Sequence, residues 1–179
     1  MVSELVNTLA HLKVSLSHTT RPMRPGERDG VDYCFVDEQM FQKMKQEQCF
    51  LEYAKVFGHY YGTSKVWVQQ ALAAGDDVIL EIDWQGAQQI RSLYSDAVSI
   101  FILPPSLEIL EQRLIARAQD EAEVVQRRLA EAKSEIAHHA EFDYLIINDQ
   151  FPIALEDLKS IIQAKRLQMA VQRQKYAQL

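Results

Sequence analysis

Short apolar runs alternate with segments of helical periodicity along most of this chain. Three runs have the length of buried strands, at 78–82 (VILEI), 99–103 (SIFIL) and 144–147 (YLII). Each run is bounded by turn or helix-capping signals, which predicts strands buried on both faces. A helical pattern follows each run, so we expect an α/β fold in which helices cover both faces of a parallel sheet.

Two of these helices have recognisable N-terminal signals. Ser106 follows two prolines and is a candidate N-cap for the segment LEILEQRLIARA. Pro152 falls where the first turn of a helix tolerates proline. Apolar residues recur with helical spacing from Ile153 to Met169, which predicts helical structure after the third strand.

The segment 17–66 interrupts the alternation. It is rich in loops and aromatic residues, with one short predicted helix at 38–45. The whole chain has 179 residues, a length that fits one domain with a sizeable core. We therefore interpret 17–66 as a subdomain inserted into a single domain that spans residues 1–179.

Composition excludes several classes of function. The formal net charge is −6, so nucleic acid is not an expected partner, and a bound anion must be held by a local basic cluster. Cys34 and Cys49 have neither CxxC nor histidine spacing, so we expect no disulfide framework and no zinc site. No apolar run has the length of a membrane span and no signal-peptide core is present, which predicts a cytoplasmic protein.

The segment 17–33 (SHTTRPMRPGERDGVDY) supplies a basic cluster on a loop stiffened by two prolines, with Arg21, Arg24 and Arg28. Guanidinium groups match phosphate oxygens bidentately, and each charge-assisted hydrogen bond contributes roughly 1.5–3 kcal/mol. Composition fits two alternatives equally. One is a phosphate site to which two phenolic side chains, Tyr33 and Tyr61, add donors. The other is a solvated turn whose arginines pair with the acids Glu27, Asp29 or Asp32.

Two acids and a threonine form a second group of candidates. Asp83 directly follows the predicted strand 78–82, and open parallel sheets bind ligands at strand ends. A carboxylate accepts hydrogen bonds from the ring N–H and exocyclic amine of guanine, whereas adenine lacks the ring donor. Glu52 and Asp83, with Thr63, therefore favour a guanine pocket. Taken singly, Glu52 fits a surface residue and Asp83 fits a helix cap.

These candidates lie in segments that resemble guanylate kinases of the bacterial type. The matching segments are SHTTRPMRPGE, DGVDY, FLEYAKVFGHYYGTS, VILEIDWQGAQQIR, SIFILPPS, EFDYLIIND and the basic C-terminal helix, so the resemblance covers nearly all of the chain. It implies a P-loop NTPase-like, three-layer fold with a GMP-binding subdomain at 17–66 and a helical lid at 107–130. It also implies transfer of the terminal phosphoryl group of magnesium ATP to GMP.

The resemblance assigns roles residue by residue. The implied ligands of the GMP phosphate are Arg21, Arg24, Tyr33 and Tyr61. The implied ligands of guanine are Ser17, Glu52, Thr63 and Asp83. Arg117 and Arg128 match lid arginines that close on the transferring phosphoryl group, and Glu81 matches an acid near the metal and phosphates. Arg113 and Asn148 are expected to contact ATP. Mg²⁺ is expected to accompany ATP, and no residue is assigned as its ligand.

The lid arginines also have a simpler interpretation. Arg113 and Arg117 are four residues apart and share one face of a helix, which points them the same way. The same spacing is typical of a solvated basic stripe paired with neighbouring acids. In addition, Ala116 and Ala118 stand where the family usually has glycine. Alanine lacks glycine's access to positive φ, so we expect a stiffer hinge.

A larger departure concerns the ATP phosphates. The family opens with a strand and a loop of the form GxxGxGK[ST], whose amides and lysine hold phosphates at a helix N-terminus. This sequence contains no such motif, and residues 1–18 resemble the family only from within the helix after that loop. We therefore expect GMP binding with weak ATP binding and little turnover, and exposed edges on the strands next to the missing one.

Three functions remain open from the sequence. The first is a guanylate kinase family enzyme whose GMP site is intact. The second is a catalytically inactive guanylate-kinase-like module that binds GMP or a phosphorylated partner, which Asp83, Arg117 and Arg128 argue against. The third is another nucleoside monophosphate kinase, and Glu52 with Asp83 disfavours adenine or thymine. The expected partners are GMP and ATP, and the amphipathic C-terminal segment is consistent with a homo-oligomer.

Overall fold

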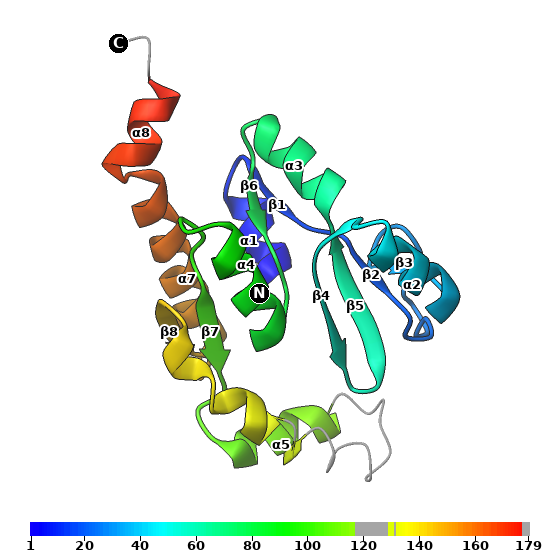
Figure 1. Ribbon diagram of the computed structural model, residues 1–179. Helices are drawn as coiled ribbons and strands as arrows, with labels where there is room; N and C mark the ends of the chain where they lie inside the picture. The colour runs from blue at the N-terminus through cyan, green and yellow to red at the C-terminus, as the bar shows by residue number, and fades with distance from the viewer. Residues whose placement is uncertain (117–128, 131, 177–179) are drawn as a thin grey trace. The chain divides into compact units, whose positions relative to one another are not determined.

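The computed structural model describes residues 1–116, 129–130 and 132–176. Strands and helices alternate along the chain, as Figure 1 shows, and parallel strand pairs occur as predicted, so the α/β class is confirmed. The chain divides into two compact units. The first comprises Met1–Leu9 with Ile100–Leu179, and the second comprises Ala10–Ser99.

The second unit contains two sheets. A parallel pair joins β1 (Leu12–Val14) to β6 (Asp77–Ile79). A four-stranded mixed sheet has the order β3-β2-β5-β4. Its strands are β2 (Ser17–Thr19), β3 (Cys34–Phe35), β4 (Phe50–Val56) and β5 (His59–Ser64). The helices of this unit are α2 (Glu38–Gln46), α3 (Lys65–Ala73) and α4 (Trp84–Leu93).

A tight turn fixes the β4–β5 hairpin. Phe57 and Gly58 connect the strands, with φ angles of 51° and 83°. Two consecutive positive φ angles are the conformation of a two-residue I′ turn, whose twist matches that of the flanking strands. Val56 pairs with His59 on either side of the turn. The hairpin register, and with it the placement of every side chain on β4 and β5, follows from this turn.

Helix α2 covers one face of the mixed sheet. Asp37 caps it by accepting the amide N–H of Met40 at 2.6 Å, so the predicted helix at 38–45 is confirmed with one added residue. Phe41 of α2 is fully buried and stacks on Phe50 and Tyr60, with ring centroids 4.6 and 5.3 Å apart. These aromatic contacts close that face, and they leave the opposite face of the sheet for other side chains.

Helices α3 and α4 build a second core within this unit. Its buried centre is Leu51 of β4, Val68 of α3 and Ile90 of α4. Val78 and Ile82 pack against this cluster from β6 and the segment that follows it. The predicted strand at 78–82 is therefore wrong at its end, because β6 stops at Ile79 and the chain turns into the start of α4. The apolar run is real, but only its first part pairs in a sheet.

The first unit contains a second parallel pair. Strands β7 (Ile100–Leu103) and β8 (Tyr144–Ile147) pair from end to end, which confirms the predicted positions of both strands. Its helices include α1 (Val2–Thr8), α5 (Leu107–Ala116), a short 3₁₀ helix (His139–Glu141), α7 (Phe151–Arg166) and α8 (Met169–Lys175). Ser106 caps α5 by accepting the amide N–H of Ile109, and Pro152 lies in the first turn of α7, both as predicted.

Burial on both faces is wrong for this strand pair. Ile146 is 3% exposed, but its neighbours Leu145 and Ile147 are 48% and 46% exposed. Successive side chains of a strand point to opposite faces, so one face of β8 is covered and the other is open among the described residues. The helical pattern predicted after the third strand is confirmed and forms two helices, because α7 ends at Arg166 and α8 begins at Met169. No helix in the described part of the chain is long and apolar enough to cross a bilayer.

Candidate active site

The register of the mixed sheet gathers four of the predicted GMP ligands on one face. Residues paired directly across antiparallel strands point to the same side. Thr63 of β5 pairs with Ser17 of β2 and with Glu52 of β4, so the three form a row across the sheet. Tyr61 lies two residues before Thr63 and so shares its face, about 7 Å along the strand. This is the face opposite the one that α2 covers.

A bulge in β4 aims Glu52 at this face. The pairing register shifts between Phe50, which pairs with Ser64, and Glu52, which pairs with Thr63. In a regular strand, residues two apart share a face. The extra residue, Leu51, reverses this relation, so that Phe50 stacks under α2 while Glu52 lies on the opposite side. The bulge therefore allows neighbouring positions of one strand to serve a core and a candidate site.

Glu52 is a buried acid with one defined donor. It is 3% exposed, and the hydroxyl of Thr63 donates to its Oε1 at 2.5 Å. Burial raises the pKa of the Glu52 carboxyl above its ordinary value; the Thr63 hydrogen bond opposes this shift, and the negative charge of Asp83 adds to it. The effect of the Asp83 charge on Glu52 shows that the two predicted guanine ligands lie within electrostatic range. A carboxylate held in so dry a site interacts strongly with any N–H donor that reaches it.

Asp83 is the N-cap of α4. Its Oδ1 accepts the amide N–H of Gly86 at 3.0 Å, and its Oδ2 accepts the side-chain amide of Gln85 at 2.9 Å. The capping role that the sequence left open is therefore real. It does not exclude a ligand role, because each carboxylate oxygen has a second lone pair. The cap fixes the orientation of the carboxylate relative to α4.

Helix α4 is in turn tied to the edge of the mixed sheet. Gln89 donates from Nε2 to the carbonyl of Tyr53 at 2.9 Å and accepts the Tyr53 amide N–H at Oε1 at 3.2 Å. These two bonds substitute for a neighbouring strand along β4. One helical turn earlier, Gly86 comes so close that a β-carbon there would lie 2.5 Å from Glu52 Oε2. Gly86 was not among the predicted residues, since nothing in its sequence context indicates this approach.

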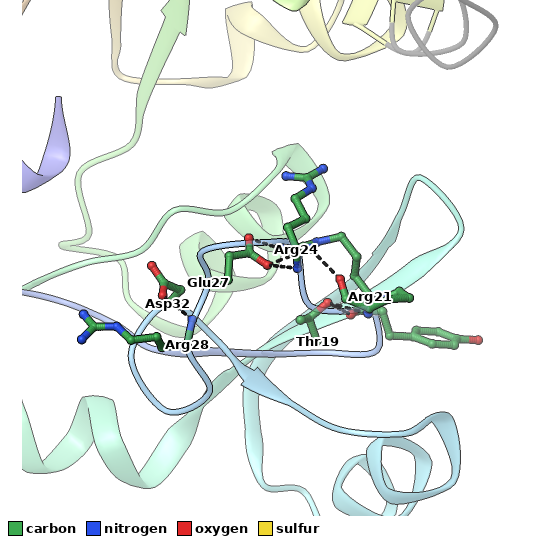
Figure 2. A network of polar contacts seen from close by, with 8 residues as sticks. Thr19, Arg21, Arg24, Glu27, Arg28 and Asp32 are labelled. Atoms are coloured by element: carbon green, nitrogen blue, oxygen red, sulfur yellow. Dashed lines mark hydrogen bonds and ion pairs between the residues drawn. The ribbon is translucent and has the colours of Figure 1, made fainter. Parts of the chain in front are cut away.

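The arginine loop begins at a buried anchor, shown in Figure 2. Thr19 is fully buried; its hydroxyl donates to the Tyr60 carbonyl at 3.0 Å and accepts the Arg21 amide N–H at 3.1 Å. Glu27 then binds both predicted phosphate arginines. It accepts Arg21 Nη2 at Oε1 (2.7 Å), and it accepts Arg21 Nη1 (3.0 Å) and the Arg24 amide N–H (2.7 Å) at Oε2. The pairing of an arginine with a loop acid, left open by the sequence, is thus realised for Arg21.

The predicted phosphate ligands lie around this ion pair. The Arg21 guanidinium lies 5.3 Å from the centre of the Tyr33 ring, and the Tyr33 and Tyr61 rings meet edge to face at 6.0 Å. Burial raises the pKa of Tyr33; Tyr61 and Glu81 also raise it, while Arg21 lowers it. Glu81 therefore lies within electrostatic range of the same cluster. In Figure 2 the Arg24 guanidinium extends away from Glu27.

Arg28 belongs to a separate turn of the loop. Its amide N–H donates to Asp32 Oδ2 at 2.8 Å, and its carbonyl accepts the Asp32 amide N–H at 3.0 Å. Figure 2 shows this pair on the other side of Glu27 from Arg21. Of the three arginines in the loop, the described contacts therefore unite Arg21 and Arg24 through one carboxylate, and they leave Arg28 outside that network.

The predicted ATP ligands lie in the first unit. Arg113 donates from Nη1 to the Asn148 carbonyl at 2.8 Å and from Nη2 to the Asp149 carbonyl at 3.3 Å, so Arg113 and Asn148 are neighbours. Arg117 and Arg128, the predicted lid arginines, lie outside the described residues. Within the described ranges, no group of three or more His, Cys, Asp or Glu side chains is arranged to hold a metal ion.

Comparison with known proteins gives a consistent result. The family model described as guanylate kinase matches residues 1–165. A guanylate kinase of Coxiella burnetii is 55% identical over 179 residues, which is 100% of this chain and 87% of the relative. One of Hahella chejuensis is 57% identical over 98% of this chain and 85% of the relative. The crystal structure of guanylate kinase from Anaplasma phagocytophilum superposes with a TM-score of 0.81, at 32% identity over 94% of this chain and 81% of that one.

Proposed function

The chain belongs to the guanylate kinase family, and on that premise we propose that it transfers the terminal phosphoryl group of ATP to GMP, giving ADP and GDP. One observation supports the proposal above others. Thr63 and Tyr61 share a face of β5, and Thr63 lies beside the buried acid Glu52 while Tyr61 adjoins the arginine cluster. Acceptors suited to a base and donors suited to a phosphate therefore occupy one surface.

The acid side of this surface suits guanine. In the proposed complex, Glu52 and Asp83 accept hydrogen bonds from the ring N–H and exocyclic amine of the base, and the hydroxyls of Ser17 and Thr63 line the same row. Adenine has no ring N–H at that edge, so one buried acceptor would stay unpaired. An unpaired buried carboxylate is costly, which is the basis of strong discrimination.

The basic side suits a phosphate monoester. We assign its oxygens to the guanidinium groups of Arg21 and Arg24 and to the phenols of Tyr33 and Tyr61. A monoester carries nearly two negative charges at neutral pH, and arginine forks match its oxygens in plane. The rings of Tyr33 and Tyr61 also limit access of water to the Arg21 head, which strengthens each charge-assisted bond.

The transfer step demands positioning and charge neutralisation more than covalent chemistry. We assign charge neutralisation to Arg117 and Arg128, and contacts with ATP to Arg113 and Asn148. Magnesium enters as part of the ATP substrate, and Glu81, close to Tyr33, is the assigned acid beside the phosphates. The alternative of an inactive binding module is not favoured, because the curated relatives are themselves named guanylate kinases.

Isothermal titration with GMP, guanosine and AMP tests the proposal. GMP is expected to bind more tightly than either of the others. Arg21→Ala and Glu52→Gln are each expected to weaken GMP binding about tenfold or more, because each removes charge-assisted bonds worth roughly 1.5–3 kcal/mol apiece. Arg28→Ala, in the same loop but outside the network, is the matched control. Unchanged GMP affinity in both site variants would contradict the assignment. GMP-dependent release of ADP from ATP tests the transfer itself, and turnover is expected to be low because this sequence has no GxxGxGK[ST] motif to hold the ATP phosphates.

A further inference from the structure

We propose that Glu27 is a positioning residue of the GMP site, an inference that rests on the proposed function: its carboxylate holds Arg21 and the backbone of Arg24 in the arrangement that receives the phosphate. The ion pair with Arg21 is bidentate, with N–O distances of 2.7 and 3.0 Å. Its side chains are only 10% and 18% exposed. A guanidinium group that makes two hydrogen bonds to one carboxylate and is shielded from water is restricted to one orientation.

Glu27 also shapes the backbone. It accepts the Arg24 amide N–H at Oε2, and its own amide N–H donates to the Arg24 carbonyl at 3.1 Å. This reciprocal pair closes a turn over residues 24–27, while Thr19 anchors the start of the loop. The same carboxylate therefore sets the side chain of one phosphate arginine and the backbone of the other.

The contacts to Glu27 use only part of the Arg21 head. Nη1 donates to Glu27 and to the Pro22 carbonyl, and Nη2 donates one hydrogen to Glu27. A guanidinium has five donors in one plane. The edge formed by Nε and the outer hydrogen of Nη2 is therefore directed away from Glu27. The Arg24 guanidinium also extends away from Glu27 in Figure 2, so both heads can reach a ligand without breaking the ion pair.

Two opposing effects decide whether Glu27 strengthens or weakens GMP binding. A carboxylate beside a phosphate repels it, which would weaken GMP binding. Fixing the Arg21 side chain and the Arg24 backbone before the ligand arrives removes part of the ordering cost of binding, which strengthens binding. Because Glu27 makes three hydrogen bonds to the two arginines and engages neither the outer edge of the Arg21 head nor the Arg24 guanidinium, we expect positioning to dominate.

The experiment compares GMP with guanosine, which lacks the phosphate. Titration of Glu27→Ala should show GMP affinity lower by about tenfold with guanosine affinity unchanged. Glu27→Gln keeps an acceptor for the Arg24 amide but loses the charge, so its GMP affinity should lie between that of the wild type and that of Glu27→Ala. Asp32→Asn is the matched control, because Asp32 also accepts a loop amide N–H, that of Arg28, in a separate turn of the loop. In an Arg21→Ala background, Glu27→Ala should have a much smaller effect, since the shared ion pair is already gone.

Each other outcome has a distinct meaning. Tighter or unchanged GMP binding by Glu27→Gln would overturn the inference, because repulsion would then equal or exceed positioning. Equal weakening of GMP and guanosine, together with a lower unfolding midpoint, would also overturn it and leave a purely structural role. Wild-type protein that binds GMP no better than guanosine would overturn the proposed function, and this inference with it.

Discussion

Gly86 and Glu52 lie so close that any side chain at Gly86 would meet the Glu52 carboxylate. A β-carbon would lie 2.5 Å from Oε2 and 3.1 Å from the Cβ of Ile82. The Glu52 carboxylate and helix α4 lie this close because Gln89 of α4 is hydrogen-bonded to Tyr53 of β4. Because Gly86 has no side chain, the carboxylate of Glu52, a proposed ligand of guanine, occupies the space beside α4.

The substitution Gly86→Ala is expected to weaken guanine binding with little change in stability. Alanine favours the helix by up to about 1 kcal/mol, which offsets part of the steric cost. The side chain that must move is Glu52, so GMP and guanosine affinity should fall together, about tenfold, in titration calorimetry. Ser92→Ala, on the exposed side of the same helix, is the control. Unchanged affinity in Gly86→Ala would show that Glu52 has room to move without loss of binding.

Local signals predicted the elements well and the site geometry only in part. Ser106 and Pro152 mark helix starts through capping and φ restriction, which act within one turn of chain. The bulge at Leu51 and the approach of Gly86 depend on pairing partners far away in sequence, so no local pattern indicates them. Glu27 was one of three loop acids that the sequence left open as partners of the arginines, and nothing local indicated its hydrogen bond to the Arg24 backbone.

Thr63 is expected to matter more for its hydroxyl than for its shape. Thr63→Val keeps the volume but removes the donor to Glu52 Oε1, which leaves a buried carboxylate oxygen without that partner. The free energy of unfolding should fall by about 1–3 kcal/mol, measured by urea denaturation at neutral pH. Thr63→Ser, which keeps the hydroxyl, should lose clearly less. If the valine and serine variants were equally stable, the hydrogen bond would contribute nothing measurable.

The raised pKa of Glu52 predicts a pH-dependent stability. Burial lifts the folded-state pKa above the ordinary value of 4.5. Below pH 4.5 the side chain is protonated in both states. As pH rises from there through the folded-state pKa, the unfolded chain releases its proton first, so this group's contribution to the free energy of unfolding falls.

Glu52→Gln removes that titration. The stability of the glutamine variant minus that of the wild type should therefore increase as pH rises from 4.5 through the folded-state pKa of Glu52, measured by urea denaturation at each pH. Glu27 provides a check of opposite sign. Its bond with Arg21 lowers the pKa of the Glu27 carboxyl in the folded state, so the contribution of Glu27 to the free energy of unfolding is lost as pH falls below 4.5. A stability difference independent of pH across this interval would show that Glu52 titrates alike in both states.

Arg113 is expected to stabilise the segment after β8 through the two hydrogen bonds of its guanidinium group. Its Nη1 and Nη2 donate to the carbonyls of Asn148 and Asp149, a geometry that a lysine ammonium does not reproduce. Arg113→Lys keeps the charge, so the loss should come from the second hydrogen bond and amount to about 1 kcal/mol or less at this exposed position. Thermal unfolding measures it, with Arg173→Lys in α8 as the control. GMP affinity should stay unchanged, since Arg113 is not among the proposed GMP ligands. An unfolding midpoint equal to that of the wild type would mean that the guanidinium hydrogen bonds of Arg113 do not stabilise the fold, which leaves the group available to a ligand such as ATP.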